Sequence, residues 1–465
     1  MVTGMPEPIS SVHFIGICGT AMGAVAAAMR RRGFRVTGSD AKCYPPMSDF
    51  LARTGIGLCE GYRPANLPEG EVLVVVGNAI SRGNPEVEAV LDRRMDYLSL
   101  PEALRRFFLR GKRNFVVTGT HGKTTTTSML AWMLETGGQD PGFLIGGVPR
   151  DFGMGARFTD SPFVVVEGDE YDTAFFDKRA KFLHYLPEVA VVNNIEFDHA
   201  DIYASLDEIK TSFRRLLRVV PGNGLILANG DDAACLDVVA DAFSPVTTVG
   251  FGDACTVRIE GVCYEPGRST FRLGDATFAM AMDGEFNVRN AAMAAVAARF
   301  AGLDDRLIAS ALATFTGVCR RQEERGRKRG VRVIDDFAHH PTALRHVIRS
   351  MRQRHPGERI WALFEPRSNT TRRNIFQDDL AAALAEADRV VVAQVEDNSK
   401  VPVGQRLDPR LLVEAIRAGG REAWLEADAE AIVRRVVPEA REGDLLLVLS
   451  NGGFGGIHGK LLAAL

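Results

Sequence analysis

The chain has 465 residues, of which 46% are hydrophobic and 25% are charged, as in a soluble globular protein of several domains. Its formal net charge of −3 gives no overall field that would attract nucleic acid or an anionic membrane. The seven cysteines are widely spaced and form no C-x-x-C pair, so neither a disulfide framework nor a cysteine-based zinc site is indicated, and a reducing compartment fits best.

The beginning of the chain does not resemble a targeting segment. Residues 1–19 lack a basic stretch followed by a long apolar core, and the chain then enters a strand and a glycine turn. No apolar run approaches the roughly 20 residues that a membrane helix needs. We therefore expect a cytoplasmic protein that acts on small molecules.

The first block alternates strands and helices. Apolar runs at 12–17, 34–37 and 71–80 predict strands, and residues 21–33 predict a helix between the first two. This alternation is typical of βαβ units in a doubly wound parallel sheet. We expect this first domain to span residues 1–110.

The turn after the first strand is glycine-rich. It reads G-I-C-G-T-A-M-G at 16–23, with Cys18 where a dinucleotide-binding fingerprint has its second glycine. Asp40, at the end of the second strand, could accept hydrogen bonds from ribose hydroxyls. A plain packing turn and a nicotinamide-dependent oxidoreductase are the alternatives at this point.

The second block opens with a candidate phosphate loop. After a strand at 115–118, residues 117–127 read V-T-G-T-H-G-K-T-T-T-T. The first glycine of the usual P-loop is missing, because position 117 is Val117. The strand, glycine turn, lysine and helix start still suit an anion, with Lys123 on the phosphates and Thr124 on Mg²⁺. A capped turn of small residues is the alternative.

Two further polar groups follow predicted strands of this block. Glu167 ends the apolar run in 163–170, where a Mg²⁺-bound nucleotide needs a carboxylate. His199 follows the run in 189–199 and is either a metal ligand or a surface histidine. Residues 248–284 predict a small β-rich insert.

The third block begins after the strongly basic stretch 317–330, which we interpret as a hinge. Four apolar strands then end in polar or small residues, a pattern typical of a second open α/β sheet with functional loops at the carboxyl ends of its strands. They lie in segments 331–341, 359–370, 388–396 and 444–456.

Three motifs carry a family resemblance. The loop G-T-H-G-K-T-T-T, the segment V-E-G-D-E-Y-D and the segment N-N-I-E-F-D-H-A-D resemble the central domain of the Mur ligases. These are ATP-dependent enzymes that form the amide bonds of the peptidoglycan peptide. The resemblance implies an α/β protein of three domains: Rossmann-like at 1–110, P-loop ATPase-like at 111–318 and Rossmann-like at 319–465. These domains would bind a UDP-sugar, ATP and a peptide acceptor, respectively.

The resemblance also implies a set of nucleotide and metal contacts. The catalytic residues would be Lys123, Glu167 and His199, and Thr124, Glu167 and His199 would bind Mg²⁺. Phe286 replaces a histidine of the family pattern, and Phe213 stands nearest the place of a lysine that several members carbamoylate. The implied ATP-binding residues are Gly119, Thr120, His121, Gly122, Lys123, Thr124, Thr125, Asn290, Arg320 and Asp335.

The two outer blocks would hold the other substrates. Segments 365–370 and 450–458, with weaker support from 43–48, 77–85 and 175–179, resemble the branch that joins the tripeptide L-alanyl-γ-D-glutamyl-meso-diaminopimelate to UDP-N-acetylmuramate. The alternative acceptor is free L-alanine. The implied peptide contacts are Arg367, Ser368 and Asn369. The implied UDP-sugar contacts are Gly16, Cys18, Gly19, Thr20, Ala21, Met22, Ser39, Asp40 and Asn78.

One other class of protein could use the phosphate loop. A P-loop switch or motor would hydrolyse ATP without an acceptor amine or a UDP-sugar. We favour the ligase, in peptidoglycan recycling, as a monomer or weak homodimer that binds neither nucleic acid nor membrane.

Overall fold

The structure is a computed structural model that describes residues 9–44, 47–399 and 401–465. Residues 1–8, part of the stretch assessed for a targeting segment, and Pro45 and Pro46 of the 43–48 motif lie outside the described residues. Among the helices of the described residues, none combines the length and the apolar character that a membrane span requires.

The N-terminal unit is a parallel sheet with helices on its faces. Its strands are β1 (Ser11–Ile15), β2 (Arg35–Asp40), β3 (Gly57–Glu60), β4 (Leu73–Val76) and β5 (Tyr97–Ser99). Its helices are α1 (Thr20–Arg31), α2 (Met47–Arg53), α3 (Pro85–Asp92) and α4 (Leu100–Leu104). The strand order β3-β2-β1-β4-β5 is that of a Rossmann-like half-sheet. Every residue of β1 and β4 is buried, which explains their continuous apolar runs.

The central unit has the longest sheet, in the order β17-β16-β15-β14-β13-β12-β6-β9-β7-β8. Its parallel core contains β6 (Arg113–Thr118), β7 (Gly142–Leu144), β9 (Phe163–Glu167), β12 (Pro187–Val192), β13 (Leu225–Asn229) and β14 (Val246–Gly250). Strand β8 (Ala156–Arg157) closes one edge, and β10 (Asp172–Ala174) pairs with β11 (Asp177–Ala180) in a separate ribbon. The helices are α5 (Lys123–Thr136), α6 (Leu206–Leu217), α7 (Ala233–Val239), α8 (Glu285–Phe300) and α9 (Asp305–Thr314).

The predicted β-rich insert extends this sheet. It contains the strands β15 (Val257–Glu265), β16 (Arg268–Leu273) and β17 (Ala276–Met280), which pair antiparallel with one another. Strand β15 also pairs with β14, so the insert lengthens the sheet on the side away from the phosphate loop.

The C-terminal unit is an α/β sheet in the order β18-β19-β23-β20-β21-β22. Its strands are β18 (Glu323–Lys328), β19 (Val331–Asp336), β20 (Arg359–Phe364), β21 (Arg389–Ala393), β22 (Glu422–Glu426) and β23 (Asp444–Leu449). Its helices are α10 (Pro341–Arg354), α11 (Gln377–Leu384), α12 (Pro409–Ala418), α13 (Ala429–Val436) and α14 (Ile457–Ala464). The basic stretch 317–330 is therefore only in part a hinge, because β18 is the antiparallel edge strand of this sheet.

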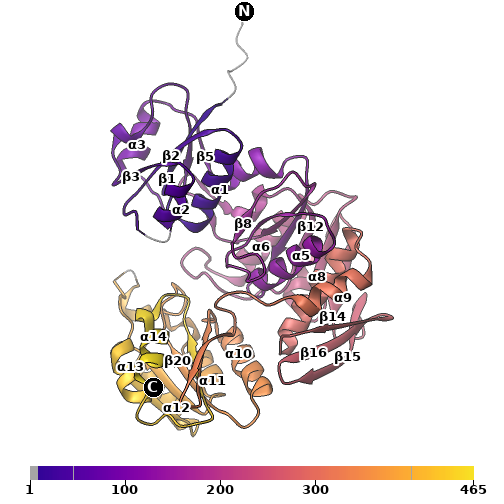
Figure 1. The fold of residues 1–465 in the computed structure, drawn as a ribbon, viewed down its shortest axis with the longest axis vertical. Helices are drawn as coiled ribbons and strands as arrows, with labels where there is room; N and C mark the ends of the chain where they lie inside the picture. Colours follow the sequence, from indigo (N-terminus) through magenta and orange to yellow (C-terminus); the bar gives the residue numbers. More distant parts are fainter. Residues whose placement is uncertain (1–8, 45–46, 400) are drawn as a thin grey trace, which may run out of the picture.

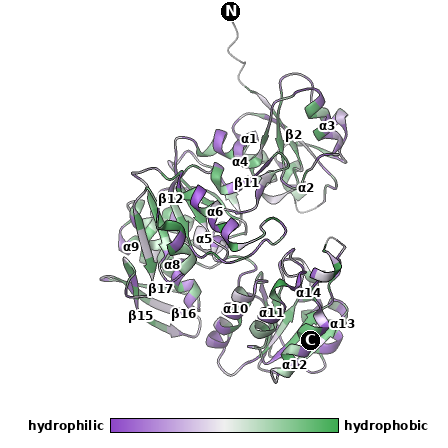
Figure 2. Cartoon of the chain, turned by 180° about the vertical axis from the view of Figure 1, so that it is seen from behind, coloured by the Kyte–Doolittle hydropathy of each residue, from purple (hydrophilic) through white to green (hydrophobic). Residues whose placement is uncertain are grey.

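The N-terminal and C-terminal units lie at opposite ends of the molecule, with the central unit between them (Figure 1). Seen from behind, apolar residues concentrate on the sheet strands and on the helix faces that cover them (Figure 2). Phe108, in the segment that joins α4 of the N-terminal unit to β6 of the central unit, packs against Phe158 of the central unit, with ring centroids 4.3 Å apart. Helix α10 lies on the side of the C-terminal unit that faces the central unit (Figure 1). His340, just before it, therefore contacts Phe197 after β12 and His121 of the phosphate loop.

Candidate active site

The phosphate loop joins β6 to α5 and requires glycine at two positions. Gly119 and Gly122 have φ values of +130° and +79°, a region that other residues rarely adopt. A Cβ atom at Gly122 would lie 2.4 Å from Oδ1 of Asn290. The loop is also anchored from β12, because Asn194 accepts the backbone N–H of His121 at 2.7 Å. The turn therefore has one rigid conformation that leaves the N-terminus of α5 facing the cavity.

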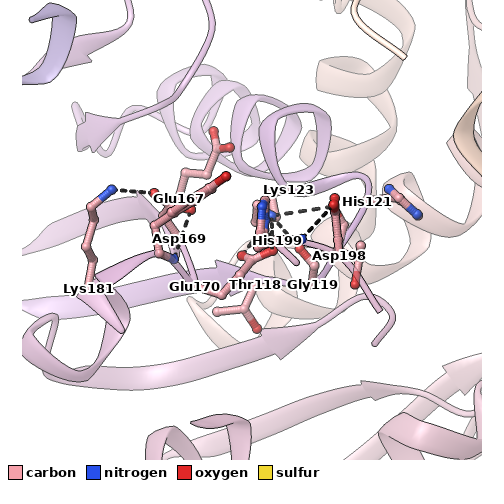
Figure 3. Close-up of polar contacts among 12 residues, drawn as sticks. Thr118, Gly119, His121, Lys123, Glu167, Asp169, Glu170, Lys181, Asp198 and His199 are labelled. Carbon is pink, nitrogen blue, oxygen red and sulfur yellow. Dashed lines mark hydrogen bonds and ion pairs between the residues drawn. The ribbon is translucent and has the colours of Figure 1, made fainter. Parts of the chain in front are cut away.

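Lys123 is the first residue of α5 and has a buried carboxylate as its partner. Its Nζ donates to both carboxylate oxygens of Glu170 at 2.9 Å and to the Gly119 carbonyl at 2.7 Å. Burial would lower the pKa of Lys123, but the carboxylates of Glu170 and Asp169 outweigh it and raise that pKa. The ammonium group is therefore charged at neutral pH and points along the inside of the loop (Figure 3).

His199 meets the same carboxylate from the other side. Its Nε2 lies 3.0 Å from Oε1 of Glu170. Burial would lower the pKa of His199, but the hydrogen bond to Glu170 outweighs it and raises that pKa. Glu170 therefore contacts both Lys123 and His199, and a second pair, Lys181 and Asp169, lies nearby with Nζ and Oδ2 2.6 Å apart (Figure 3).

Glu167 ends β9 next to the start of α5. Its Oε1 accepts the Thr124 hydroxyl at 2.9 Å, and its Oε2 accepts the Gly146 backbone N–H at 2.6 Å. Burial raises the pKa of Glu167 in spite of these bonds. A hydroxyl and a carboxylate in contact are oxygen donors of the kind that Mg²⁺ prefers. These two residues therefore fit a hard divalent cation, whereas His199 is directed at Glu170.

A cavity of about 460 Å³ lies in front of the loop, between the central and C-terminal units. The side-chain amide of Asn290 is buried at this cavity, and its Nδ2 has no hydrogen-bond partner. The other walls of the cavity include Phe286 of α8 and His346 of α10, whose rings are nearly parallel with centroids 5.6 Å apart. The cavity thus has Lys123 and the Asn290 amide beside the phosphate loop, and the aromatic rings of Phe286 and His346 in its other walls.

The C-terminal unit reaches this region through the loop after β20. Thr370 donates to Oδ1 of Asp198 at 2.7 Å, and Asn369 donates to Oδ2 of Asp201 at 2.7 Å. Arg367 is half exposed, and a Cβ atom at Gly452 would lie 2.4 Å from its Cδ. The loop that carries the predicted peptide contacts therefore docks on the segment around His199.

In the N-terminal unit, the glycine turn lies against the end of β2. Gly16 has a φ of +86°, and the backbone N–H of Cys18 donates to Oδ2 of Asp40 at 2.8 Å. Ser39 accepts the backbone N–H groups of Gly16 and Ile17 through its carbonyl. The first turn of α1 has no side-chain cap at Gly19, so its N–H groups are available to an anion.

Comparison with known proteins identifies the family. Residues 11–112 match the profile "Mur ligase family, catalytic domain", residues 117–298 match "Mur ligase middle domain", and residues 320–452 match "Mur ligase, glutamate ligase domain". The chain is also 43% identical to UDP-N-acetylmuramate–L-alanyl-γ-D-glutamyl-meso-2,6-diaminoheptandioate ligase of Escherichia coli K12, covering 98% of each protein. The chain belongs to the Mur ligase family. The predicted family, three-part α/β fold and ATP-dependent ligase class are confirmed.

Two other relatives agree with the family assignment and differ in the acceptor that their names give. A crystal structure of a murein peptide ligase from Psychrobacter arcticus has a TM-score of 0.73 and 36% identity to the chain, covering 98% of both. UDP-N-acetylmuramate–L-alanine ligase of Variovorax paradoxus is 34% identical over 98% of this chain and 96% of that protein. Both acceptor classes considered from the sequence are thus represented among the Mur ligase relatives.

The cavity of this Mur ligase brings together most of the predicted nucleotide contacts. The predicted residues that line it are Thr120, His121, Gly122, Lys123, Thr124, Thr125, Glu167, His199 and Asn290. Arg320 and Asp335 are not among the lining residues; they pair with each other at 3.3 Å. Their neighbours Arg321 and Asp336 line the cavity instead. Successive side chains of a strand point to opposite faces of the sheet. A shift of one position along β19 therefore determines which of the two aspartates faces the cavity.

Glu170 is a further site residue that the sequence did not single out. It lies in the acidic run after β9, where Asp169, Glu170 and Asp172 are indistinguishable by type. Only the three-dimensional structure shows that Glu170 holds both Lys123 and His199.

Proposed function

We propose that this Mur ligase joins the tripeptide L-alanyl-γ-D-glutamyl-meso-diaminopimelate to UDP-N-acetylmuramate, with hydrolysis of ATP to ADP and phosphate, in peptidoglycan recycling in the cytoplasm. The observation that carries this proposal is the docking of Asn369 and Thr370 on Asp201 and Asp198, the residues on either side of His199. The name of the E. coli relative supports this acceptor. The second candidate, ligation of free L-alanine, is favoured by the name of the 34% identical relative.

We assign one substrate to each unit, with boundaries at 1–110, 111–318 and 319–465. The glycine turn and the start of α1 would hold the pyrophosphate of the UDP-sugar, with Ser39, Asp40 and Asn78 around it. In this structure Asp40 accepts the Cys18 N–H, so a ribose hydroxyl would bind its free lone pairs.

The central cavity would hold ATP. The loop 119–125 and the N-terminus of α5 would surround the phosphates, and Lys123 would exchange Glu170 for a phosphate oxygen. The unpartnered amide of Asn290, on the same helix as Phe286, would contact the adenine edge. Arg320 and Asp335 would act through the 450–452 loop, because Arg320 donates to the Ser450 carbonyl at 2.8 Å.

Thr124 and Glu167 would hold Mg²⁺, and His199 would contribute if it leaves Glu170. Bound there, the ion would neutralise charge on the phosphates of ATP during transfer. The remaining chemistry belongs to the substrates and the chain. A muramate carboxylate oxygen attacks the γ-phosphorus and ADP leaves. The tripeptide amine then attacks the acyl carbon, loses a proton and expels phosphate.

The protein residues would stabilise these steps by position and charge. Lys123 lies where negative charge accumulates on the transferred group. Arg367 offers a planar, half-exposed guanidinium that can bind a peptide carboxylate with two hydrogen bonds. A tripeptide with several carboxylates needs such a cation, whereas free L-alanine has only one carboxylate.

The acceptor is tested by ADP release. Protein, ATP, Mg²⁺ and UDP-N-acetylmuramate are combined with the tripeptide, with L-alanine or with no amine. We expect kcat/KM for the tripeptide to exceed that for L-alanine by at least about 100-fold, as when a site built for polar groups meets an analogue that lacks them. A preference for L-alanine would establish the second candidate. Equal ADP release without any amine would contradict both.

A further inference from the structure

A second group of potential metal ligands lies where the central and C-terminal units meet. It consists of His121 in the phosphate loop, Glu196 in the loop after β12 and His340 at the start of α10, and one ligand atom from each lies within 4.8 Å of the others. None of the three belongs to the Thr124, Glu167 and His199 set. We propose that His121, Glu196 and His340 form a site for a transition-metal ion such as Zn²⁺ or Co²⁺, which links the phosphate loop to α10.

The distances suit a small divalent ion. Oε2 of Glu196 lies 3.6 Å from Nε2 of His121 and 3.5 Å from Nδ1 of His340. Two zinc ligands about 2.0–2.2 Å from the metal at a tetrahedral angle lie about 3.4 Å apart. Two edges of the ligand triangle therefore match already. The third edge, between the two histidines, is no longer than 4.8 Å.

The second ring nitrogen of His340 is already bonded as in known metal sites. Its Nε2 lies 3.2 Å from the carbonyl oxygen of Phe197 and can donate to it. Metal-binding histidines regularly donate their other N–H to a carbonyl or carboxylate in this way. Nδ1 of His340 lies 3.5 Å from Oε2 of Glu196 and accepts the Thr342 backbone N–H at 3.3 Å as the N-cap of α10, so a metal ion on Nδ1 would replace this long hydrogen bond. Glu196 also accepts the Thr342 hydroxyl at 2.6 Å, which orients the carboxylate.

One of the ligand nitrogens makes no hydrogen bond. The buried Nε2 of His121 lies 3.6 Å from Oε2 of Glu196, too far for a hydrogen bond, and makes no other hydrogen bond. A buried ring nitrogen without a partner is an unusual feature that a metal ligand would explain.

The ligand types separate this site from the magnesium site. Two imidazoles and one carboxylate suit Zn²⁺, Co²⁺ or Ni²⁺, whereas Mg²⁺ prefers oxygen donors. Three protein ligands leave one position open to water or to a phosphate oxygen. Since His121 and Glu196 come from the central unit and His340 comes from the C-terminal unit, a bound ion would hold these two units together.

The site is tested by Co²⁺ binding to the full chain after removal of metals with EDTA, in excess Mg²⁺. We expect one tight Co²⁺ ion with the strong visible absorbance of four-coordinate cobalt, displaced by Zn²⁺. His340→Asn should weaken binding at least about 100-fold, the upper end of what loss of an outer-shell partner costs. Asparagine is a good N-cap and therefore preserves the start of α10. Glu196→Gln is the second variant if His340→Asn does not fold.

Two controls locate the ion. His346→Asn changes a histidine of the same cavity outside the cluster, and His199→Asn changes the predicted magnesium ligand; both should retain the cobalt spectrum. Zn²⁺ should also raise the thermal midpoint of the wild type but not of His340→Asn, because a ligand stabilises only the folded state that binds it. Retention of the spectrum in His340→Asn and Glu196→Gln, its loss in His199→Asn, or no saturable binding by the wild type would overturn the proposal.

Discussion

Glu170 is the buried carboxylate that links Lys123 and His199 in the candidate site. It is 3% exposed and contacts both Lys123 and His199. Removing one member of a buried ion pair costs about 3–5 kcal/mol, because the other charge remains buried without a partner. Any substitution of Lys123 therefore tests stability as well as chemistry, and the variant must be designed for both.

Glu167 provides a pH-dependent prediction at the scale of a single residue. Its pKa is raised in the folded state, chiefly by burial, so the ionised carboxylate destabilises the fold at pH values above both its folded and unfolded pKa. Glu167→Gln should abolish ligation and raise the thermal midpoint at pH 7, by about 2–4 °C for each kcal/mol gained. The difference in thermal midpoint between Glu167→Gln and the wild type should become smaller as the pH falls through the raised pKa of Glu167.

Thermal unfolding of both proteins from pH 7 to pH 5 measures this difference. A gap that stays constant with pH would show that the carboxylate carries no such penalty. Retained ligation by Glu167→Gln would remove Glu167 from the site.

At the scale of the element, the phosphate loop depends on how closely α8 and β12 approach it. Gly122 forms the left-handed turn before α5, and the space where its Cβ would lie is filled by Asn290. Gly138 has a similar φ of +72°, but its Cβ would meet nothing within 4 Å. Comparing the same substitution at the two glycines therefore distinguishes the effect of backbone strain from that of steric overlap.

We expect Gly138→Ala to lose about 1–2 kcal/mol of unfolding free energy, the cost of a left-handed conformation for an ordinary residue, and to keep its activity. Gly122→Ala should lose at least that much and also lose ATP binding, because Asn290 must move. Denaturant unfolding and nucleotide titration measure the two effects. Equal behaviour of the two variants would contradict the role of close packing at Gly122.

The elements themselves were largely predictable. The apolar runs at 12–17 and 71–80 correspond to β1 and β4, and the run in 163–170 corresponds to β9, because strands buried on both faces have continuous apolar sequences. The basic stretch 317–330 concealed the strand β18, since an exposed edge strand needs no apolar face.

Individual site residues were less predictable than the elements that carry them. Lys123 and Glu167 follow strands and stand out by type. Arg321 and Asp336 do not, because each lies beside a residue of the same type. The interaction of Asp198 with Thr370 joins residues that are 172 positions apart, and no local pattern reports such a contact.

At the scale of the whole molecule, the hydrogen bonds between the C-terminal loop and the His199 segment couple two units. Thr370 and Asp198 are both buried, and their bond is to a charged group, which is worth about 1.5–3 kcal/mol. Thr370→Val should therefore lower kcat/KM for the tripeptide by at least about 10-fold. ATP affinity should change little, since Thr370 does not line the nucleotide cavity. Steady-state kinetics and nucleotide titration check this, and an equal loss of both would place the effect in general folding instead.

The central claim is that Lys123 holds the transferred phosphoryl group while a sugar carboxylate is activated for amide formation. Its most direct test is mass spectrometry of the product formed from UDP-N-acetylmuramate, tripeptide and ATP. The wild type and Lys123→Met/Glu170→Gln are compared; the double variant removes the ammonium and the carboxylate together, so neither of these two charges is left without the other, and the glutamine amide oxygen can still accept from His199 Nε2. We predict a product with the summed mass of donor and tripeptide less one water from the wild type, and at least about 100-fold slower formation by the folded double variant. Undiminished formation by that variant would contradict the account.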